Sequence, residues 1–252
     1  MIKKFNYKLF VGSNLYNLYE NIVTLNAFPL KSIVPYGFDF TYDIQRFLGK
    51  KELSIIFDVG ANVGGYSKRF NKYFKNADIF AFEPINTTYE ILNQNLCGNN
   101  KIKSFNLGLG EKIGELFVNL VDDSEKNSFK NKSIDNTEGG NCQKVDLDTL
   151  DNFCDSCSIN FIDLLKLDVE GYEINVLKGA KKFLENNKIN FIYSEVSFNS
   201  SDSYKVLHSE LYEMLKGYGF NLCGFYETKR WNQNKYIAFT NALFHNPDFN
   251  KS

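Results

Sequence analysis

The sequence predicts an α/β fold built on one mostly parallel sheet of seven strands, with an antiparallel last strand and helices on both faces. From residue 54 onward, short and continuous apolar segments alternate with segments of helical character. Strands that are apolar on both sides are typical of parallel sheets covered by helices. The last two expected strands follow each other with no room for a crossover helix, so we expect them to pair antiparallel.

The expected strands, in chain order, span residues 54–58, 77–82, 102–106, 164–168, 190–195, 219–226 and 235–244. Helices are expected between them at residues 64–74, 87–96, 173–185 and 203–216. The alternation of apolar strand and helix supports each of these assignments. We therefore expect residues 51–252 to form one Rossmann-like domain.

The first 50 residues have a different pattern. Leu15, Leu18 and Ile22 recur at helical spacing after a capping Ser13, and a short second helix is expected around residues 40–48. Pro29 separates the two helices. We expect residues 1–50 to be a helical extension that acts as a lid or as a contact in a homodimer.

Composition excludes several classes of protein. The 252 residues carry a formal net charge of −1, which argues against a nucleic-acid binder, and 16% aromatic residues supply ample core material. No apolar run approaches the roughly 18 residues of a membrane span. Five cysteines, an odd number that includes an isolated Cys154–Cys157 pair, suit free thiols and a cytoplasmic location.

A glycine-rich segment follows the first expected strand. Asp58-Val59-Gly60-Ala61-Asn62-Val63-Gly64-Gly65 joins that strand to a helix, where open α/β sheets bind ligands. The spacing is G-x-x-x-G, unlike the G-x-G-x-x-G that holds a dinucleotide pyrophosphate. A cofactor with a charged amino-acid tail and no phosphate fits this segment better than a nicotinamide dinucleotide. The alternative is a tight strand-to-helix turn without a ligand.

Acidic residues follow two further strands. Glu83, in Phe82-Glu83-Pro84, is placed to accept hydrogen bonds from the ribose hydroxyls of an adenosine, or else lies beside the start of the next helix. Asp168 and Glu170 end the fourth expected strand, and such carboxylates can act as a general base or hold a divalent cation. We interpret Glu173 as a first-turn helix residue favoured by the helix dipole.

Four segments in order resemble the FkbM-type S-adenosylmethionine-dependent methyltransferases, over roughly residues 55–196. They are DVGANVGGYS (58–67), AFEP (81–84), VDLDTLDNF (145–153) and LLKLDVEGYE–VLKGA (164–180). The resemblance implies the class I methyltransferase fold and O-methylation of hydroxyls on sugars, polysaccharide precursors or polyketides. It also implies which residues contact the cofactor: Asp58, Gly60, Ala61, Asn62, Gly64, Tyr66, Ser67, Glu83, Pro84, Asn106, Ser128 and Asp168.

Two mechanisms are open for activating the acceptor hydroxyl. A general base could remove its proton, with Asp168, Glu170, Glu195 and His208 as candidates. Alternatively, Mg²⁺ or Mn²⁺ held by Asp168 and Glu195 could lower the pKa of the hydroxyl. Aromatic residues near the C-terminus (Phe225, Tyr226 and Trp231) could stack on a sugar ring or serve in packing.

We expect the acceptor to be a nucleotide sugar or a precursor of a surface polysaccharide such as capsule or lipopolysaccharide. A polyketide or a lipid-linked hydroxyl is the alternative within the same enzyme class. Outside it, the chain could be a non-catalytic subunit that binds S-adenosylmethionine. Tight binding of NAD would instead indicate a dehydrogenase, which the glycine spacing disfavours.

Overall fold

The chain divides into two compact units, residues 1–49 and 50–252. The structure, a computed structural model, describes residues 35–119, 142–199, 205–231 and 235–249. In the first unit, helix α4 (Phe40–Leu48) has the bounds expected from the sequence. The Asp39 side chain caps it by accepting a hydrogen bond from the Thr41 N–H at 2.8 Å. The other expected helix, around Leu15 to Ile22, lies outside the described residues.

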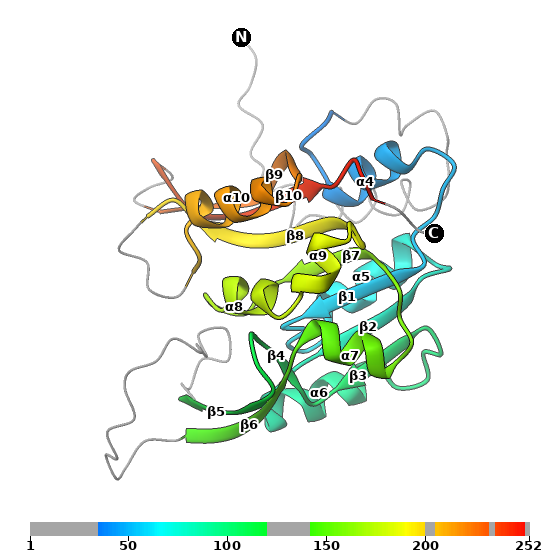
Figure 1. Ribbon diagram of the computed structural model, residues 1–252, viewed down its shortest axis with the longest axis vertical. Coiled ribbons are helices and arrows are strands. Elements are labelled where there is room, and N and C mark those ends of the chain that lie inside the picture. The colour runs from blue at the N-terminus through cyan, green and yellow to red at the C-terminus, as the bar shows by residue number, and fades with distance from the viewer. Residues whose placement is uncertain (1–34, 120–141, 200–204, 232–234, 250–252) are drawn as a thin grey trace, which may run out of the picture. The chain divides into compact units, whose positions relative to one another are not determined.

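The second unit is built on a seven-stranded sheet (Figure 1). Its strands are β1 (Ile55–Val59), β2 (Asp78–Phe82), β3 (Ile102–Phe105), β7 (Ile162–Leu167), β8 (Ile189–Ser197), β9 (Asn221–Trp231) and β10 (Tyr236–His245). The order across the sheet is β3-β2-β1-β7-β8-β10-β9, and β10 runs antiparallel to both of its neighbours. The expected α/β class, the seven strands and the antiparallel hairpin are confirmed.

Helices cover both faces of this sheet. They are α5 (Gly65–Tyr73), α6 (Asn86–Leu96), α7 (Leu150–Ser156), α8 (Glu173–Lys178), α9 (Lys181–Glu185) and α10 (His208–Gly217). The single helix expected at residues 173–185 is wrong, because Gly179 and Ala180 separate α8 from α9. The helix expected from residue 203 begins only at His208, after Leu207 forms an isolated bridge with Ser197 of β8.

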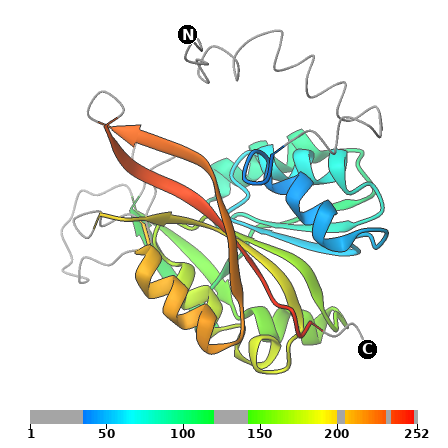
Figure 2. The same ribbon diagram turned by 90° about the horizontal axis from the view of Figure 1, so that it is seen from above.

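Strand alternation divides the sheet into an apolar face and a face with polar residues. Successive side chains of a strand point to opposite faces. Val59, Leu165 and Val196 belong to the main apolar core, together with residues of α7, α8, α9 and α10. Figure 2 shows α5, in cyan, on the other side of the sheet from α10, in orange. The alternation therefore places a second set on the α5 face: Asp58, Lys166, Tyr193, Glu195 and Asn241.

A small second sheet was not predicted from the sequence. It contains β4 (Gly108–Leu109), β5 (Gly114–Asn119) and β6 (Cys142–Asp148), in the order β4-β6-β5. β4 has only two residues, and side chains of β6 are mostly exposed or half-buried, so neither has the continuous apolar run of a central strand. This sheet lies next to the chain that follows β2, where Gln143 of β6 hydrogen-bonds to Pro84 and Asn86.

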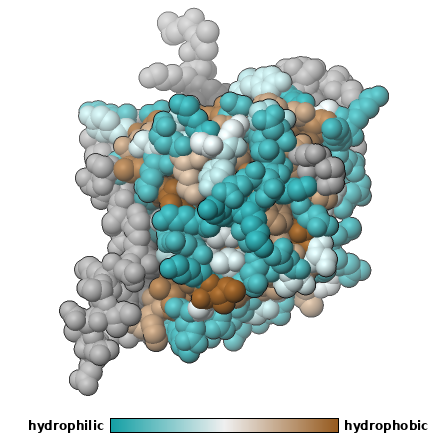
Figure 3. Space-filling model, in the orientation of Figure 1, coloured by the Kyte–Doolittle hydropathy of each residue, from teal (hydrophilic) through white to brown (hydrophobic). Residues whose placement is uncertain are grey.

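On the face of the molecule shown in Figure 3, most of the coloured residues are hydrophilic and the apolar ones form small separate spots. Among the described residues, no helix has the length and apolar character that crossing a bilayer requires.

Gly179, which follows α8, allows the end of this helix to pack closely on the residue after β4. A Cβ atom at this position would lie 1.9 Å from the backbone oxygen of Gly110, so an alanine forces one backbone away from the other. We predict that Gly179→Ala lowers the free energy of unfolding by about 1–3 kcal/mol, measured by urea denaturation. Gly114→Ala is the matched control, since a Cβ there meets nothing within 4 Å. Equal stability of the two variants would contradict this account of the packing.

Candidate active site

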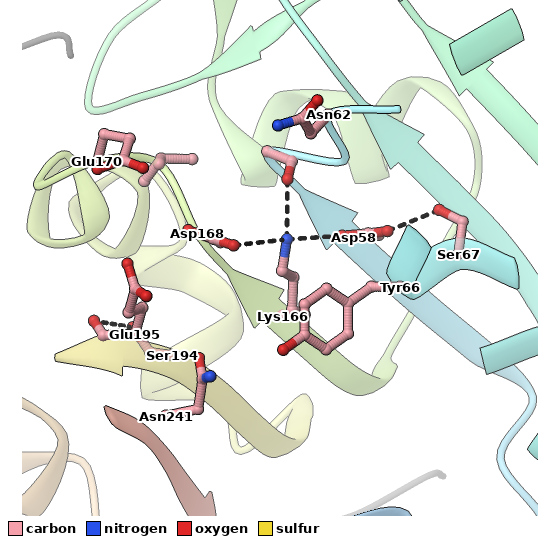
Figure 4. A network of polar contacts seen from close by, with 12 residues as sticks. Asp58, Asn62, Tyr66, Ser67, Lys166, Asp168, Glu170, Ser194, Glu195 and Asn241 are labelled. Carbon is pink, nitrogen blue, oxygen red and sulfur yellow. Dashed lines mark hydrogen bonds and ion pairs between the residues drawn. The ribbon is translucent and has the colours of Figure 1, made fainter. Parts of the chain in front are cut away.

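A buried lysine on β7 stands at the centre of the polar face (Figure 4). The Lys166 ammonium lies 3.0 Å from Asp58 Oδ1, 2.8 Å from the carbonyl oxygen of Gly60 and 3.5 Å from Asp168 Oδ2. The side chains of Lys166 and Asp58 are 3% and 0% exposed. Burial lowers the pKa of Lys166, but the two carboxylates outweigh burial and raise that pKa above its ordinary value. Lys166 is therefore a fixed positive charge in the site.

Asp58 connects three elements through its carboxylate. Besides Lys166, it accepts a hydrogen bond from the buried Ser67 hydroxyl on α5, at 2.6 Å. β1 is thereby tied to β7 and to the first turns of α5. Asp58 and Ser67 were both expected at the cofactor, and in the structure both side chains are fully buried.

The glycine segment after β1 adopts a conformation that ordinary residues rarely take. Gly60 has φ 75°, and a Cβ atom on it would lie 1.9 Å from the backbone oxygen of Asp168. Asn62 and Gly64 also have positive φ, 49° and 89°. The N–H groups of Gly60 and Ala61 both donate to the Phe82 carbonyl, at 3.0 and 2.9 Å. The segment therefore turns sharply between the carboxyl ends of β7 and β2.

Glu83 lies at the end of β2, directly beside this turn. Its two carboxylate oxygens accept hydrogen bonds from the N–H groups of Asn62 and Ile85, each at 3.0 Å. Burial raises the pKa of Glu83 to about 7, against the lowering effect of those hydrogen bonds. The structure thus brings together Glu83 and Asn62, two of the residues expected to contact the cofactor.

Two amides hold the chain just after Glu83. Asn106 Nδ2 donates to the carbonyl oxygens of Glu83 and Pro84, at 3.0 and 3.1 Å. Gln143 Nε2, from the small sheet, donates to the Pro84 carbonyl at 3.2 Å. Asn106 and Pro84 were expected at this rim, whereas Gln143 was missed because its strand was not predicted. The expected cofactor residue Ser128 lies outside the described residues.

Three carboxylates gather where β7 and β8 end. Asp168, Glu170 and Glu195 each offer an oxygen, and these oxygens lie within 4.8 Å of one another. Burial is the largest cause that raises the pKa of both Glu170 and Glu195 to about 7. The structure therefore brings together three of the four residues that the sequence analysis named as candidate bases.

Glu170 reaches this cluster through an unusual turn. Its φ is 50°, in the left-handed region, and the following Gly171 has φ 92°. Such backbone in a residue other than glycine costs of order 1–3 kcal/mol and is often found at functional sites. Glu173 begins α8 and accepts from the N–H groups of Val169 and Gly171, at 3.3 and 3.2 Å. Its interpretation as a first-turn helix residue is confirmed.

A lysine that the sequence analysis did not single out completes the cluster. Lys205 Nζ lies 3.3 Å from Glu170 Oε2 and also contacts Glu195 Oε2. Lys205 precedes α10 and belongs to no recognised motif, so nothing in the sequence indicated that it contacts Glu170 and Glu195.

Tyr66 and Glu227 close the polar face on the other side. The Tyr66 ring lies 4.9 Å from Lys166 Nζ, and its hydroxyl donates to the Glu227 carboxylate of β9. Burial raises the pKa of Tyr66 far above its ordinary value, so the hydroxyl stays protonated. Tyr66, expected at the cofactor, thus stacks on the central lysine.

The structure does not bring His208 to the carboxylates. His208 opens α10 on the opposite face of the sheet, and its ring lies 5.2 Å from the rings of both Phe198 and Phe225. Among the described residues, it has no hydrogen bond or ion pair to Asp168, Glu170 or Glu195. Phe225, considered for sugar stacking, belongs to this separate aromatic group, Tyr226 is buried, and the Trp231 side chain lies outside the description.

The sheet order, the glycine turn after β1 and the acidic residue after β2 define a class I methyltransferase fold. Residues 58–222 match the family model described as the methyltransferase FkbM domain, and the chain belongs to this family.

Curated relatives carry methyltransferase names. Methyltransferase sdnD of Sordaria araneosa is 32% identical over 171 residues, which cover 56% of this chain and 65% of the relative. The 2-O-methyltransferase NoeI of Sinorhizobium fredii is 26% identical, covering 57% and 63%. The hexuronic acid methyltransferase AglP of Haloferax volcanii is 26% identical, covering 61% of each. In each case the match spans less than two thirds of the relative.

The solved structures that this chain resembles include TrmK of M. capricolum in complex with S-adenosylhomocysteine. It is 10% identical to this chain, with a TM-score of 0.47, and the match covers 83% of this chain and 69% of TrmK.

The buried Lys166–Asp58 ion pair should contribute strongly to the stability of the fold. Lys166→Met leaves the Asp58 carboxylate and the Gly60 carbonyl without their cation, so we expect a loss of about 3–5 kcal/mol in the free energy of unfolding. Lys101→Met removes an exposed ion pair of the same length, 3.0 Å, between Lys101 just before β3 and Asp78 of β2, and should cost less than about 1 kcal/mol. Urea denaturation followed by circular dichroism measures both. Similar losses would show that Lys166 is not the constraint described here.

Proposed function

We propose that this protein is an S-adenosylmethionine-dependent O-methyltransferase that methylates a sugar hydroxyl, in a nucleotide sugar or a surface-polysaccharide precursor. One observation carries the proposal. The carboxylate cluster stands next to the glycine turn, and Lys166 joins the two by contacting both Asp168 and the Gly60 carbonyl. Groups suited to remove a proton therefore lie beside groups suited to hold the cofactor.

The residues fit S-adenosylmethionine. Glu83 offers buried carboxylate oxygens where a ribose would need acceptors, and a Cβ atom at Gly65 would meet nothing within 4 Å, which leaves space at the start of α5. When bound, this cofactor supplies a methyl group on a positively charged sulfur.

The chain's own part in the reaction is to orient the acceptor and to accept its proton. An alcohol is a poor nucleophile until that proton is taken, and a base works best when its pKa lies near the working pH. Glu170 and Glu195, each with a pKa raised to about 7, meet this requirement. Correct placement of the acceptor beside the cofactor supplies much of the remaining acceleration.

The alternative with Mg²⁺ or Mn²⁺ on Asp168 and Glu195 fits the cluster poorly. The Glu195 oxygen contacts the Lys205 ammonium, and Asp168 lies 3.5 Å from the Lys166 ammonium. A divalent ion would have to enter beside two positive charges. No step of the proposed reaction is therefore assigned to a metal.

The names of two relatives support a sugar acceptor, since AglP is named for a hexuronic acid and NoeI for 2-O-methylation. A polyketide or lipid-linked hydroxyl remains the alternative acceptor, and a non-catalytic cofactor-binding subunit the alternative function. A cytoplasmic location and a homodimer or lid formed by residues 1–50 are further parts of the proposal.

Release of S-adenosylhomocysteine from a panel of nucleotide sugars tests this function. We expect turnover on at least one sugar, and Glu195→Gln should reduce kcat by about 10²–10⁴-fold because the amide cannot accept the proton. Glu185→Gln, on the exposed side of α9, should behave as wild type. Cofactor binding without turnover on nucleotide sugars, assembled glycans or polyketides would favour the non-catalytic alternative.

Cofactor affinity should depend on pH through Glu83. The pKa of this carboxyl is raised to about 7, so lowering the pH through 7 protonates it and removes an acceptor for the ribose. We predict that S-adenosylhomocysteine binds about tenfold more weakly at pH 6 than at pH 8, measured by calorimetry. Glu83→Gln should bind weakly at both values. A wild-type affinity that does not change across this range would rule out an ionised Glu83 as the ribose acceptor.

A further inference from the structure

The carboxylate cluster has the composition of a divalent-cation site. Asp168, Glu170 and Glu195 present oxygens within 4.8 Å of one another, and carboxylate oxygens are the ligands that Mg²⁺ and Mn²⁺ prefer. Three half-buried carboxylates so close together repel one another unless a positive charge lies among them. The cluster therefore requires a nearby cation.

Lys205 places an ammonium group in that position. Its Nζ lies 3.3 Å from Glu170 and contacts Glu195, so it bridges the two carboxylates contributed by different strand ends. The Lys205 side chain is 13% exposed and passes over the Phe239 ring, whose centroid lies 4.6 Å from Nζ. An ammonium packed in this way is less screened by solvent than an ordinary surface charge.

The remaining carboxylate of the cluster has its own ammonium. Asp168 lies 3.5 Å from Lys166 Nζ, and Lys166 is fixed by Asp58 and by the Gly60 carbonyl. Each carboxylate therefore has a positive partner supplied by the chain. A divalent ion bound by Glu170 and Glu195 would have to share their Oε2 atoms with the Lys205 ammonium or displace that ammonium.

We infer that Lys205 is a positioning residue whose ammonium takes the place of a divalent metal in this cluster. It holds the Glu170 and Glu195 oxygens together, and it does so without an open coordination position for the acceptor. What the cluster does for catalysis rests on the proposed function, but the exclusion of a metal by Lys205 does not.

Binding of Mn²⁺, measured by calorimetry on the metal-stripped full chain, tests this inference. Wild type should bind no Mn²⁺ at the cluster. Lys205→Met keeps the length of the side chain but loses its charge, and it should bind one ion per chain at least tenfold more tightly than any residual Mn²⁺ binding to wild type. Lys205→Arg keeps a cation and should behave as wild type. The exposed Lys112→Met is the matched control for loss of one positive charge.

A double variant locates the ion. Adding Glu195→Gln to Lys205→Met should abolish the new Mn²⁺ binding. Thermal unfolding establishes that each variant is folded, and Lys205→Gln replaces Lys205→Met if the latter is not.

Two outcomes would overturn the inference. One is wild-type Mn²⁺ binding that Glu195→Gln removes. The other is a folded Lys205→Met or Lys205→Gln that binds Mn²⁺ no better than wild type. If wild type binds no S-adenosylhomocysteine and methylates nothing, the proposed function fails, and the Mn²⁺ series still decides the role of Lys205. If it does methylate an acceptor, turnover should persist in a chelator.

Discussion

The arrangement of the site depends on one buried positive charge. Lys166 is enclosed by the sheet and α5, and a buried ammonium is tolerated only where carboxylates or carbonyls surround it. Asp58, Asp168 and the Gly60 carbonyl meet this requirement, and each belongs to a different turn or strand. Fixing the lysine therefore fixes the glycine turn. This turn is also bound to Glu83, because the Asn62 N–H donates a hydrogen bond to the Glu83 carboxylate.

The two-residue period of the strands explains which residues can take part in the site. Asp58, Lys166 and Glu195 lie on one face because the positions beside them, such as Val59, Leu165 and Val196, are needed for the core on the other. α10 covers the core face, so His208 joins Phe198 and Phe225 there instead of the carboxylates. Polar chemistry and apolar packing are thus separated by the sheet itself.

Much of the fold could be predicted because the central strands are continuous apolar runs. The glycine turn, Glu83 and the acids Asp168 and Glu170 could be predicted because ligands bind at the carboxyl ends of parallel strands. Glu195 was found by the same rule, as the acid that follows the apolar residues Phe191, Ile192 and Tyr193 of β8 with one serine between.

What could not be predicted depends on contacts between distant segments. Lys166 lies within the predicted strand LLKLD, but its ionic partners could not be predicted, because they depend on β1 pairing with β7. Lys205 is separated from Glu170 by 35 positions in the sequence. It reaches the carboxylates only because the chain before α10 folds back against β8. The split between α8 and α9 falls at Gly179, whose backbone closely approaches that of Gly110. No local periodicity contains this information.

The most direct test of this account is the affinity of S-adenosylhomocysteine for wild type and for Lys166→Met, measured by calorimetry at a temperature where both are folded. If Lys166 organises the glycine turn, wild type binds one S-adenosylhomocysteine per chain. Folded Lys166→Met then loses most of that affinity, although Glu83 is unchanged. A folded Lys166→Met that binds as tightly as wild type would contradict the central claim.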